Sequence, residues 1–305
     1  MSSVPECRYI AESGPNLYAA GWTDLYRSTN RGVSFSTIPA PSGISSDDPI
    51  EGIAAGDGTL YVLRWDRLYR STDNGSTWAT VLLAEDYDRG DLGIVRAGGD
   101  VVWVTTRDYG YYQETVFLST DGGLTFAPSF FCNSSWDDES NLINGWISLD
   151  FNCGWGGPAF GFGICPTSPL TAIWTDAGRA IMGNGTIWEA VYASYSDTGE
   201  RGTGQRWSSR GLEVTSSWDI HIPTGEPGFM RVAYTDIRGA WSTDGGDSWY
   251  VGSEGIPSTW ANTNYDLTED AETGLLWGTF SGLHDIPCGW SINSWDRSGH
   301  GGVAF

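Results

Sequence analysis

One short phrase recurs along the chain and constrains the fold more than any other feature of the sequence. It combines Ser, Asp or Asn, Gly and an aromatic residue, and its clear copies are Ser28–Phe35, Ser71–Trp78, Ser119–Phe126 and Ser242–Trp249. An eroded fifth copy keeps little beyond Gly185 and Trp188. Each copy joins two short apolar runs of strand character, so the phrase predicts a β-hairpin turn in which Gly supplies a positive φ. Recurrence of one hairpin every 40–60 residues or so is typical of repeat proteins, and with four-stranded units it predicts propeller blades.

The phrase resembles the Asp-box, or BNR repeat, Ser-x-Asp-x-Gly-x-Thr-Trp. Asp73, Asp121 and Asp244 occupy its Asp position, and Asn30 stands there in the first copy. Asp-box propellers include sialidases, family-74 xyloglucan hydrolases, sortilin-type receptor domains and a photosystem assembly factor. In those families the box lies at the blade periphery, so the resemblance implies a structural role for these four residues. The Arg-Ile-Pro motif of the sialidases is not present in this sequence, which argues against a true sialidase.

The whole chain, residues 1–305, is expected to form a single all-β propeller with about six four-stranded blades. The second unit is the clearest, with strands expected at Ile50–Gly56, Leu60–Trp65, Arg67–Thr72 and Thr77–Leu83. The same pattern places the blades at about 8–39, 48–85, 93–130, 145–193, 217–251 and 264–305. The last blade lacks its fourth strand. Either Ser2–Glu6 supplies that strand, or the chain is a fragment of a propeller with seven or eight blades.

Net charge and cysteine content limit the possible binding partners and the cellular location of the protein. The net charge is −22, and every basic residue is Arg, which argues against nucleic acid and anionic membrane surfaces as partners. No apolar run approaches the ~20 residues of a membrane-spanning helix, and no signal peptide is visible after Met1. Cys132, Cys153 and Cys165 crowd one irregular stretch, where one or two disulfides are expected. Together with the Asp-box resemblance, these features favour a secreted or cell-surface protein.

A second repeat places an Asp just after each expected second strand, in the series Asp24, Asp66, Asp108, Asp176, Asp236 and Asp285. Asp favours the first position of a turn, which is a structural explanation for the whole series. These turns lie at the opposite end of each blade from the Asp-boxes, so six carboxylates could also ring one face. Glycoside hydrolysis requires two such acids, one protonated and one ionised. Ca²⁺ could sit among these oxygens, but no spacing matches a calcium loop, and neither a metal nor another cofactor is expected.

One of these positions has a closer resemblance. The segment Val232–Ala240 is similar to the Thr-Asp-x-Gly-Gly neighbourhood that carries a catalytic Asp in family-74 hydrolases. The resemblance implies a catalytic role for Asp236, although Arg238 occupies one of the Gly positions. Asp176 in Thr175–Arg179 is a weaker match and is the second catalytic candidate.

Three interruptions of the repeat, at 131–158, 194–216 and 281–300, are where ligand binding is expected. Exposed Trp rings there could stack on sugar faces. The predicted ligand-binding residues are Trp136, Trp155, Trp207, Trp290, His284 and Asp285. Most of the Trp residues assigned to second strands, among them Trp22 and Trp65, are instead expected to pack between blades.

Two functions stay open at this point. The first is engagement of a glycan or polysaccharide outside the cytoplasm, extending to hydrolysis by carboxylates at the channel face. The second is a non-catalytic propeller that binds protein partners or serves as a structural surface repeat. The two functions differ in the carboxylates that they require. A glycoside hydrolase needs two carboxylates facing one cleft, whereas a protein-interaction propeller needs none.

Overall fold

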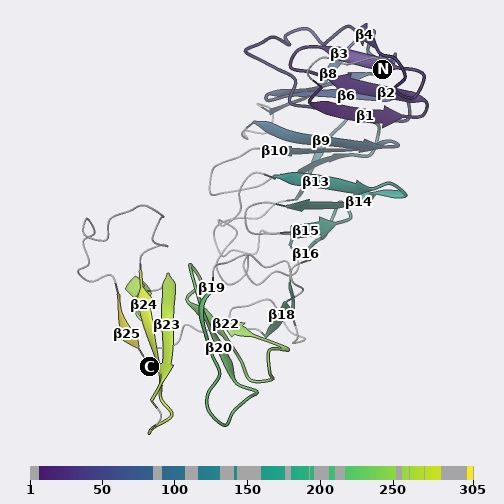
Figure 1. The fold of residues 1–305 in the computed structure, drawn as a ribbon. Coiled ribbons are helices and arrows are strands. Elements are labelled where there is room, and N and C mark those ends of the chain that lie inside the picture. The colour runs from purple at the N-terminus through teal and green to yellow at the C-terminus, as the bar shows by residue number, and fades with distance from the viewer. Residues whose placement is uncertain are drawn as a thin grey trace. The chain divides into compact units, whose positions relative to one another are not determined.

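The computed structural model describes residues 7–84, 91–106, 116–130, 141–142, 159–175, 180–191, 193–195, 206–209, 217–251, 256–260, 262–270, 272–282 and 301–304. These residues are almost entirely strands and turns (Figure 1). The chain divides into two compact units: unit 1 comprises 1–143 with 152–190, and unit 2 comprises 144–151 with 191–305. Each unit is described by itself.

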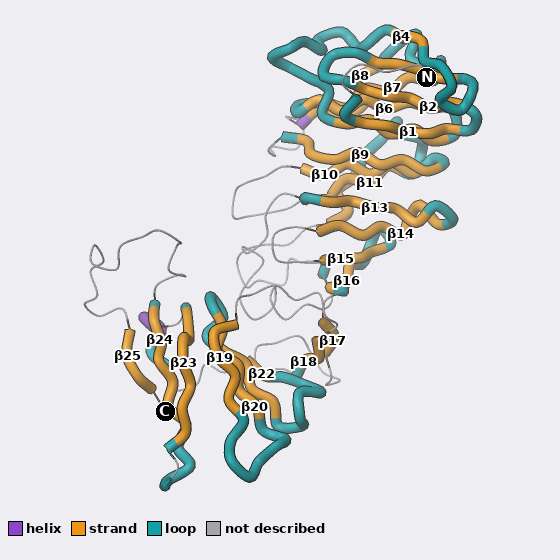
Figure 2. Tube along the Cα trace, viewed as in Figure 1, coloured by secondary structure: helices purple, strands orange, loops and turns teal. Residues whose placement is uncertain are grey.

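Unit 1 contains four antiparallel sheets of four strands, and in each sheet the strands pair in chain order (Figure 2). The first two sheets are formed by β1 (Tyr9–Ser13), β2 (Asn16–Ala20), β3 (Leu25–Ser28), β4 (Ser36–Ile38), β5 (Gly52–Gly56), β6 (Thr59–Arg64), β7 (Arg67–Ser71) and β8 (Ala79–Leu83). The next two are formed by β9 (Leu92–Gly98), β10 (Val101–Thr106), β11 (Val116–Ser119), β12 (Ala127–Phe130), β13 (Gly161–Cys165), β14 (Ser168–Thr175), β15 (Ala180–Gly183) and β16 (Trp188–Ala190). The sheets fall within the first four stretches expected to be blades. That all of residues 1–305 form one propeller stays a prediction.

Local turn chemistry explains why these strands return on themselves. Between β5 and β6 the chain reverses at Asp57 and Gly58, whose φ angles are 44° and 81°. Two consecutive positive φ values define a tight hairpin whose twist matches that of the flanking strands, and Asp-Gly is a favoured pair for it. The register then runs from Gly56↔Thr59 to Gly52↔Leu63 without a bulge.

The core of unit 1 lies between successive sheets. The first strands neighbour one another in order, β1 beside β5, β5 beside β9 and β9 beside β13. Tyr61, Leu63 and Leu68 of the second sheet belong to one buried cluster with residues of the third. In the next layer Trp103 and Trp188 pack edge to face, with ring centroids 5.7 Å apart. Because the second sheet lies between the first and the third, β6 is buried over most of its length.

Unit 2 contains a two-stranded, a four-stranded and a three-stranded sheet among its described residues. The strands are β17 (Ala193–Tyr195), β18 (Trp207–Ser209), β19 (Ser217–His221), β20 (Met230–Tyr234), β21 (Gly239–Ser242), β22 (Tyr250–Val251), β23 (Thr263–Glu269), β24 (Leu276–Ser281) and β25 (Gly301–Ala304). A short 3-10 helix, η3 (Ser258–Trp260), precedes β23. The segment Ser2–Glu6, expected as an alternative source of a fourth strand for the last sheet, lies outside the described residues.

Candidate functional site

The repeated phrase forms the same turn four times, between the third and fourth strands of a sheet. We call these four segments, Ser28–Phe35, Ser71–Trp78, Ser119–Phe126 and Ser242–Trp249, the serine–aspartate turns. In the second one, Ser71 Oγ accepts from Gly75 N (2.8 Å) and donates to Asp73 Oδ1 (2.8 Å). The other oxygen, Asp73 Oδ2, accepts from Thr77 Oγ1 at 2.6 Å. Asn30, Asp121 and Asp244 make the corresponding bonds within their own turns.

These bonds fix the ionisation of the turn carboxylates. Hydrogen bonds from the Thr77 side chain and backbone and from Ser71 lower the pKa of Asp73 to about 2. Asp244 is held at a pKa of about 2 by Ser248 and Ser242, and the pKa of Asp121 is lowered in the same way by Thr125 and Ser119. A carboxylate that is ionised and already bonded within its turn is a structural group and is not suited to act as a general acid.

The second repeat leads to the opposite end of the sheets. Asp24 directly precedes β3, Asp66 lies between β6 and β7, and Asp236 lies between β20 and β21, each in the turn after a second strand. Asp24 is exposed, whereas Asp66 and Asp236 are partly buried. Asp108, Asp176 and Asp285 lie outside the described residues, so a ring of six carboxylates stays a prediction.

Asp66 is neutralised by two arginines. Arg64 and Arg67 both bond it, with Nη2 of each 2.6 Å from Asp66 Oδ2. Burial by itself would raise the pKa of this carboxyl, but the two guanidinium groups outweigh that effect and lower the pKa to about 2. Asp66 is therefore ionised at neutral pH and unsuited to protonate a leaving group.

Asp236 occupies a strained turn. Its φ is 65°, as is that of Arg238, and its Oδ1 atom is shielded from solvent. A Cβ at Gly239 would lie 2.7 Å from Val232 O, so this position requires glycine. Burial lowers the pKa of the neighbouring Arg238. The pairing of Asp236 with Asp176 stays a prediction.

The interruption residues are placed only in part. Trp207, expected as an exposed stacking ring, is 2% exposed, and that expectation is wrong. Its backbone pairs in both directions with Trp249 of the fourth serine–aspartate turn, at 3.0 and 2.7 Å. The other predicted ligand-binding residues lie outside the described part of the chain, namely Trp136, Trp155, Trp290, His284 and Asp285.

A different pair of indoles is open to solvent. Trp22 and Trp65 follow β2 and β6, and they are 43% and 40% exposed. Trp22 Nε1 donates to Ser46 O at 3.0 Å, and Trp65 Nε1 donates to Asp48 Oδ1 at 2.8 Å. Because Ser46 and Asp48 are two residues apart in one linker, the two rings flank the same segment and are held in fixed positions. Trp22 and Trp65 are therefore exceptions to the expectation that most Trp residues of second strands pack between blades.

Charged groups surround these rings. The Arg8 guanidinium lies 4.2 Å from the Trp22 ring centroid, and that of Arg64 lies 5.8 Å from the centroid of Trp65. Arg64 also donates to Gly43 O at 2.9 Å, which ties the linker to the strand end. The six residues that we call the indole face are Arg8, Trp22, Asp48, Arg64, Trp65 and Asp66. This surface combines fixed aromatic rings with both hydrogen-bond donors and acceptors.

Sequence reasoning missed the indole face because it expected most of the Trp residues of second strands to pack between blades and did not separate Trp22 and Trp65 from the others. Trp103 and Trp174 do lie inside β10 and β14 and are buried, at 0% and 1% exposure. Trp22 and Trp65 come after the last strand residue, where the alternation of buried faces no longer applies. That position relative to the strand end is the signal that could have identified them.

Within the described ranges, no group of three or more His, Cys, Asp and Glu side chains could hold a metal ion. Cys165 is a free thiol. Cys132 and Cys153 lie outside the described residues, so the expected disulfide in this stretch stays a prediction. No helix in the described part of the chain is long and apolar enough to cross a membrane.

Solved structures resemble the fold of this chain. An ancestral GH74 enzyme aligns with a TM-score of 0.58 and 14% identity over 90% of this chain and 38% of its own. The GH74 xyloglucanase from Xanthomonas campestris aligns at 0.48 with 14% identity, over 88% of this chain and 44% of its own. YCF48 from Cyanidioschyzon merolae aligns at 0.45 with 12% identity, over 91% of this chain and 94% of its own. With the four-stranded antiparallel sheets, the first likeness shows an all-β fold of the propeller type.

Comparison of the sequence, unlike that of the structure, gives no match. No protein-family model matches the chain, and no curated protein matches it either. The structural likeness shows the fold alone, because one propeller fold carries many functions.

Proposed function

We propose that this chain is an extracellular Asp-box propeller that binds neutral glycans through the indole face of unit 1. The observation that carries the proposal is the pair Trp22 and Trp65, two large rings more than a third exposed and both anchored by their indole N–H groups. Rings fixed before binding lose little conformational entropy when a ligand stacks on them. Sugar C–H faces pack on such rings while hydroxyls bond neighbouring polar groups.

The polar groups around the rings suit hydroxyls. The Asp48 side chain is 39% exposed and can accept a hydrogen bond from a hydroxyl, while the exposed Arg8 beside Trp22 supplies donors. Polysaccharides that carry carboxylates or sulfates would be repelled by a chain whose net charge is −22. The proposal therefore specifies uncharged glycans.

Hydrolysis would be added by Asp236 with Asp176, as the resemblance to family-74 hydrolases implies. Of these two carboxylates, Asp236 lies among the described residues. Its Oδ1 atom, shielded from solvent in a strained turn, supports a catalytic role for it. The alternative, a protein-interaction propeller, needs neither acid.

Binding is tested by retardation of the protein in native gels that contain neutral or acidic polysaccharides. The variants are Trp22→Ala and Trp65→Ala, with Trp218→Ala as the matched control. Trp218 is 46% exposed, and its Nε1 is bonded to Thr235 Oγ1, but it belongs to unit 2. Each indole-face variant is expected to weaken retardation by a neutral glycan about tenfold, and the control to leave it unchanged.

Loss of binding in Trp218→Ala to the same extent, or retardation only by acidic polysaccharides, would contradict the proposal. The same polysaccharides are assayed for new reducing ends. Ends that form with the unaltered chain and vanish with Asp236→Asn would establish hydrolysis, and binding without new ends would leave a glycan-binding module.

A further inference from the structure

One linker, residues 39–50 between β4 and β5, holds both exposed rings of the indole face. Ser46 O accepts from Trp22 Nε1, and Asp48 Oδ1 accepts from Trp65 Nε1. The positions of the two rings therefore depend on the conformation of this linker. The linker contains no strand or helix of its own, so other contacts must fix it.

Two side chains of the second sheet bond the linker a few residues before these anchors. Tyr69 of β7 donates from Oη to Ser42 O at 2.9 Å, and Arg64 of β6 donates from Nη1 to Gly43 O at 2.9 Å. Tyr69 is 4% exposed, so a ring that is packed in the core presents this hydroxyl. Because two adjacent carbonyls are bonded to one sheet, the linker cannot slide along the sheet without breaking both bonds.

A short turn carries this constraint on to the anchors of the rings. Ser45 N donates to Asp48 O at 3.0 Å, and Asp48 N donates to Ser45 Oγ at 3.2 Å. Beyond the turn, Ile50 N donates to Trp22 O at 2.9 Å. The linker is thus fixed on both sides of the segment that bonds the two indoles.

Gly43 is the residue at which the linker passes the two donors of the sheet. Its φ is 93°, and a Cβ there would lie 3.2 Å from Arg64 Nη1 and 3.4 Å from Tyr69 Oη. A larger residue would strain the backbone and also press on both donors. The close approach of the linker to the sheet therefore favours glycine at this position.

We propose that Tyr69 and Gly43 are positioning residues of the glycan site, which act on the ligand through the linker and the two indoles. The inference rests on the proposed function of the indole face. When the linker is held, the rings are in place before a sugar stacks on them, and binding loses little conformational entropy. When the linker is released, the rings regain freedom that binding must remove again, so affinity falls although both rings are still present.

The first test is Tyr69→Phe, which keeps the buried ring and removes only the hydroxyl. Retardation by the neutral polysaccharide that most retards the unaltered chain is expected to weaken about fivefold. Tyr61→Phe is the matched control, because Tyr61 is also buried and its Oη donates to a main-chain carbonyl, Gly122 O, at 2.8 Å. That carbonyl belongs to the third serine–aspartate turn and not to the linker, so the control is expected to bind as the unaltered chain does.

A second readout needs no glycan. Hydrogen exchange of the indole N–H groups is followed by NMR on protein labelled with ¹⁵N-tryptophan, and the signals of Trp22 and Trp65 are identified by their loss in Trp22→Ala and Trp65→Ala. Both signals are expected to exchange several-fold faster in Tyr69→Phe and to keep their rates in Tyr61→Phe. A role of Tyr69 in stability alone would lower the urea midpoint without a selective change in these two signals.

Gly43→Ala tests the linker from its other side. It is expected to weaken retardation about tenfold, because it adds a clash with the two donors to the backbone strain. Gly58→Ala is its control: the φ of Gly58 is 81°, but a Cβ there would meet no atom within 4 Å. The control shares the strain and lies outside the linker, so its affinity is expected to be unchanged.

Unchanged affinity and unchanged indole exchange in Tyr69→Phe and Gly43→Ala would overturn the inference and leave the proposed function standing. A loss of affinity in Tyr61→Phe equal to that in Tyr69→Phe would also overturn it, because general destabilisation would then explain both. If no neutral polysaccharide retards the unaltered chain, the proposed function fails, and the inference about glycan affinity fails with it. The indole exchange rates would still report separately whether the linker holds the rings.

Discussion

The serine–aspartate turns of unit 1 and unit 2 share one internal hydrogen-bond network but differ in what covers them. In unit 1 the third turn, Ser119–Phe126, is held by the preceding sheet: Tyr61 Oη and Arg70 Nε donate to Gly122 O at 2.8 and 2.6 Å. In unit 2 the hairpin of β17 and β18 does so, with Trp207 paired to Trp249. The polar groups of the turn are satisfied by hydrogen bonds within the turn itself. The turn therefore does not depend on which segment packs against it, and the β17–β18 hairpin can take the place of a preceding sheet.

The segments packed against the turns also differ in how tightly they restrict the turn glycines. A Cβ at Gly123 would lie 2.8 Å from Cε1 of Tyr61, whereas one at the equivalent Gly246 would meet Met230 and Trp249 at an ordinary 3.5 Å. Both glycines have positive φ, 77° and 95°. The backbone requirement is thus common to the repeat, and the steric requirement belongs to unit 1.

The largest expected effect is that of Gly123→Ala. The substitution strains a left-handed backbone and also forces a methyl group against Tyr61, which is fully buried, so we expect a loss of about 3 kcal/mol in the free energy of unfolding. Gly246→Ala carries only the backbone strain and should cost about 1 kcal/mol. Urea unfolding of the two variants measures both. Equal losses would mean that Tyr61 moves aside freely and that the two covers are equivalent.

A smaller difference is expected from the two arginines that meet the turns. Arg70→Met removes a donor to Gly122 O, and Tyr61 still bonds that carbonyl, so the loss should be about 1–2 kcal/mol. Arg206→Met removes an ion pair at 4.0 Å to Asp244, in which both side chains are about a third exposed, and a hydrogen bond of 2.6 Å from Arg206 Nε to Tyr250 Oη. Solvent screening should limit that loss to less than about 1 kcal/mol. The same urea unfolding assay measures both losses. A larger loss in Arg206→Met than in Arg70→Met would show that the contacts to the turn stabilise unit 2 more than unit 1.

The strands were predictable because their signals are local. The strand expected at Leu60–Trp65 is observed as Thr59–Arg64, and that expected at Arg67–Thr72 ends at Ser71. Turn residues fix such hairpins within a few positions of each strand, so a single sequence contains the information. The hydrogen-bond network of the serine–aspartate turns is local in the same sense.

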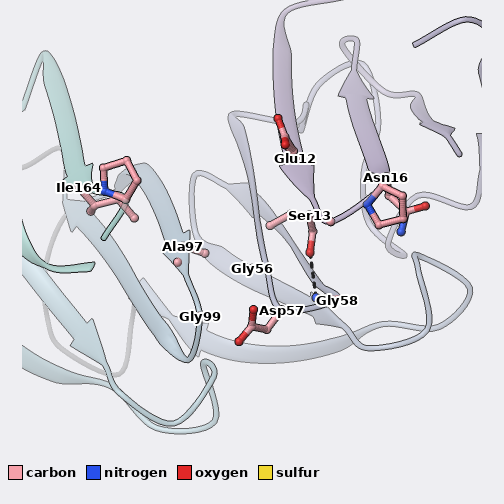
Figure 3. A pocket seen from close by; sticks show the side chains of 14 residues that line it. Glu12, Ser13, Asn16, Gly56, Asp57, Gly58, Ala97, Gly99 and Ile164 are labelled. Atoms are coloured by element: carbon pink, nitrogen blue, oxygen red, sulfur yellow. Dashed lines mark hydrogen bonds between the residues drawn. The ribbon is translucent and has the colours of Figure 1, made fainter. Parts of the chain in front are cut away.

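The candidate sites were not predictable in this way, because each depends on segments far apart in the chain. The Trp22 indole is bonded by a linker residue 24 positions away, and Trp207 is paired through its backbone with Trp249, 42 positions away in the sequence. A hollow lined by the turns β1–β2, β5–β6 and β9–β10, with Ile164 and Pro166, forms only when these separate turns meet (Figure 3). Each of these turns alone has the sequence of an ordinary hairpin. Sequence patterns report which face of a strand is buried, but they do not report what approaches its end.

The smallest expected effect distinguishes the first serine–aspartate turn from the second. Asp73 has a folded-state pKa of about 2, below the value near 4 of an unfolded chain. Its ionised form therefore stabilises the fold above about pH 4, and this contribution is lost as the pH falls toward 2. Asn30 makes the equivalent bonds without titrating. Asp73→Asn should therefore reduce the acid sensitivity of the urea midpoint, and Asn30→Asp should increase it.

The opposite signs of these two changes make the pair informative. Both variants keep a side chain whose oxygen accepts the backbone N–H of the residue four positions on, as Asn30 and Asp73 both do at present. Any general loss of packing would lower the midpoint at every pH, whereas the proton-linked contribution changes only its slope below about pH 4. Urea midpoints measured from neutral pH down to about pH 2.5 that run parallel for all three proteins would show that the turn carboxylate does not couple protonation to folding. The repeat would then owe its Asp to hydrogen-bond geometry alone, which Asn supplies equally well.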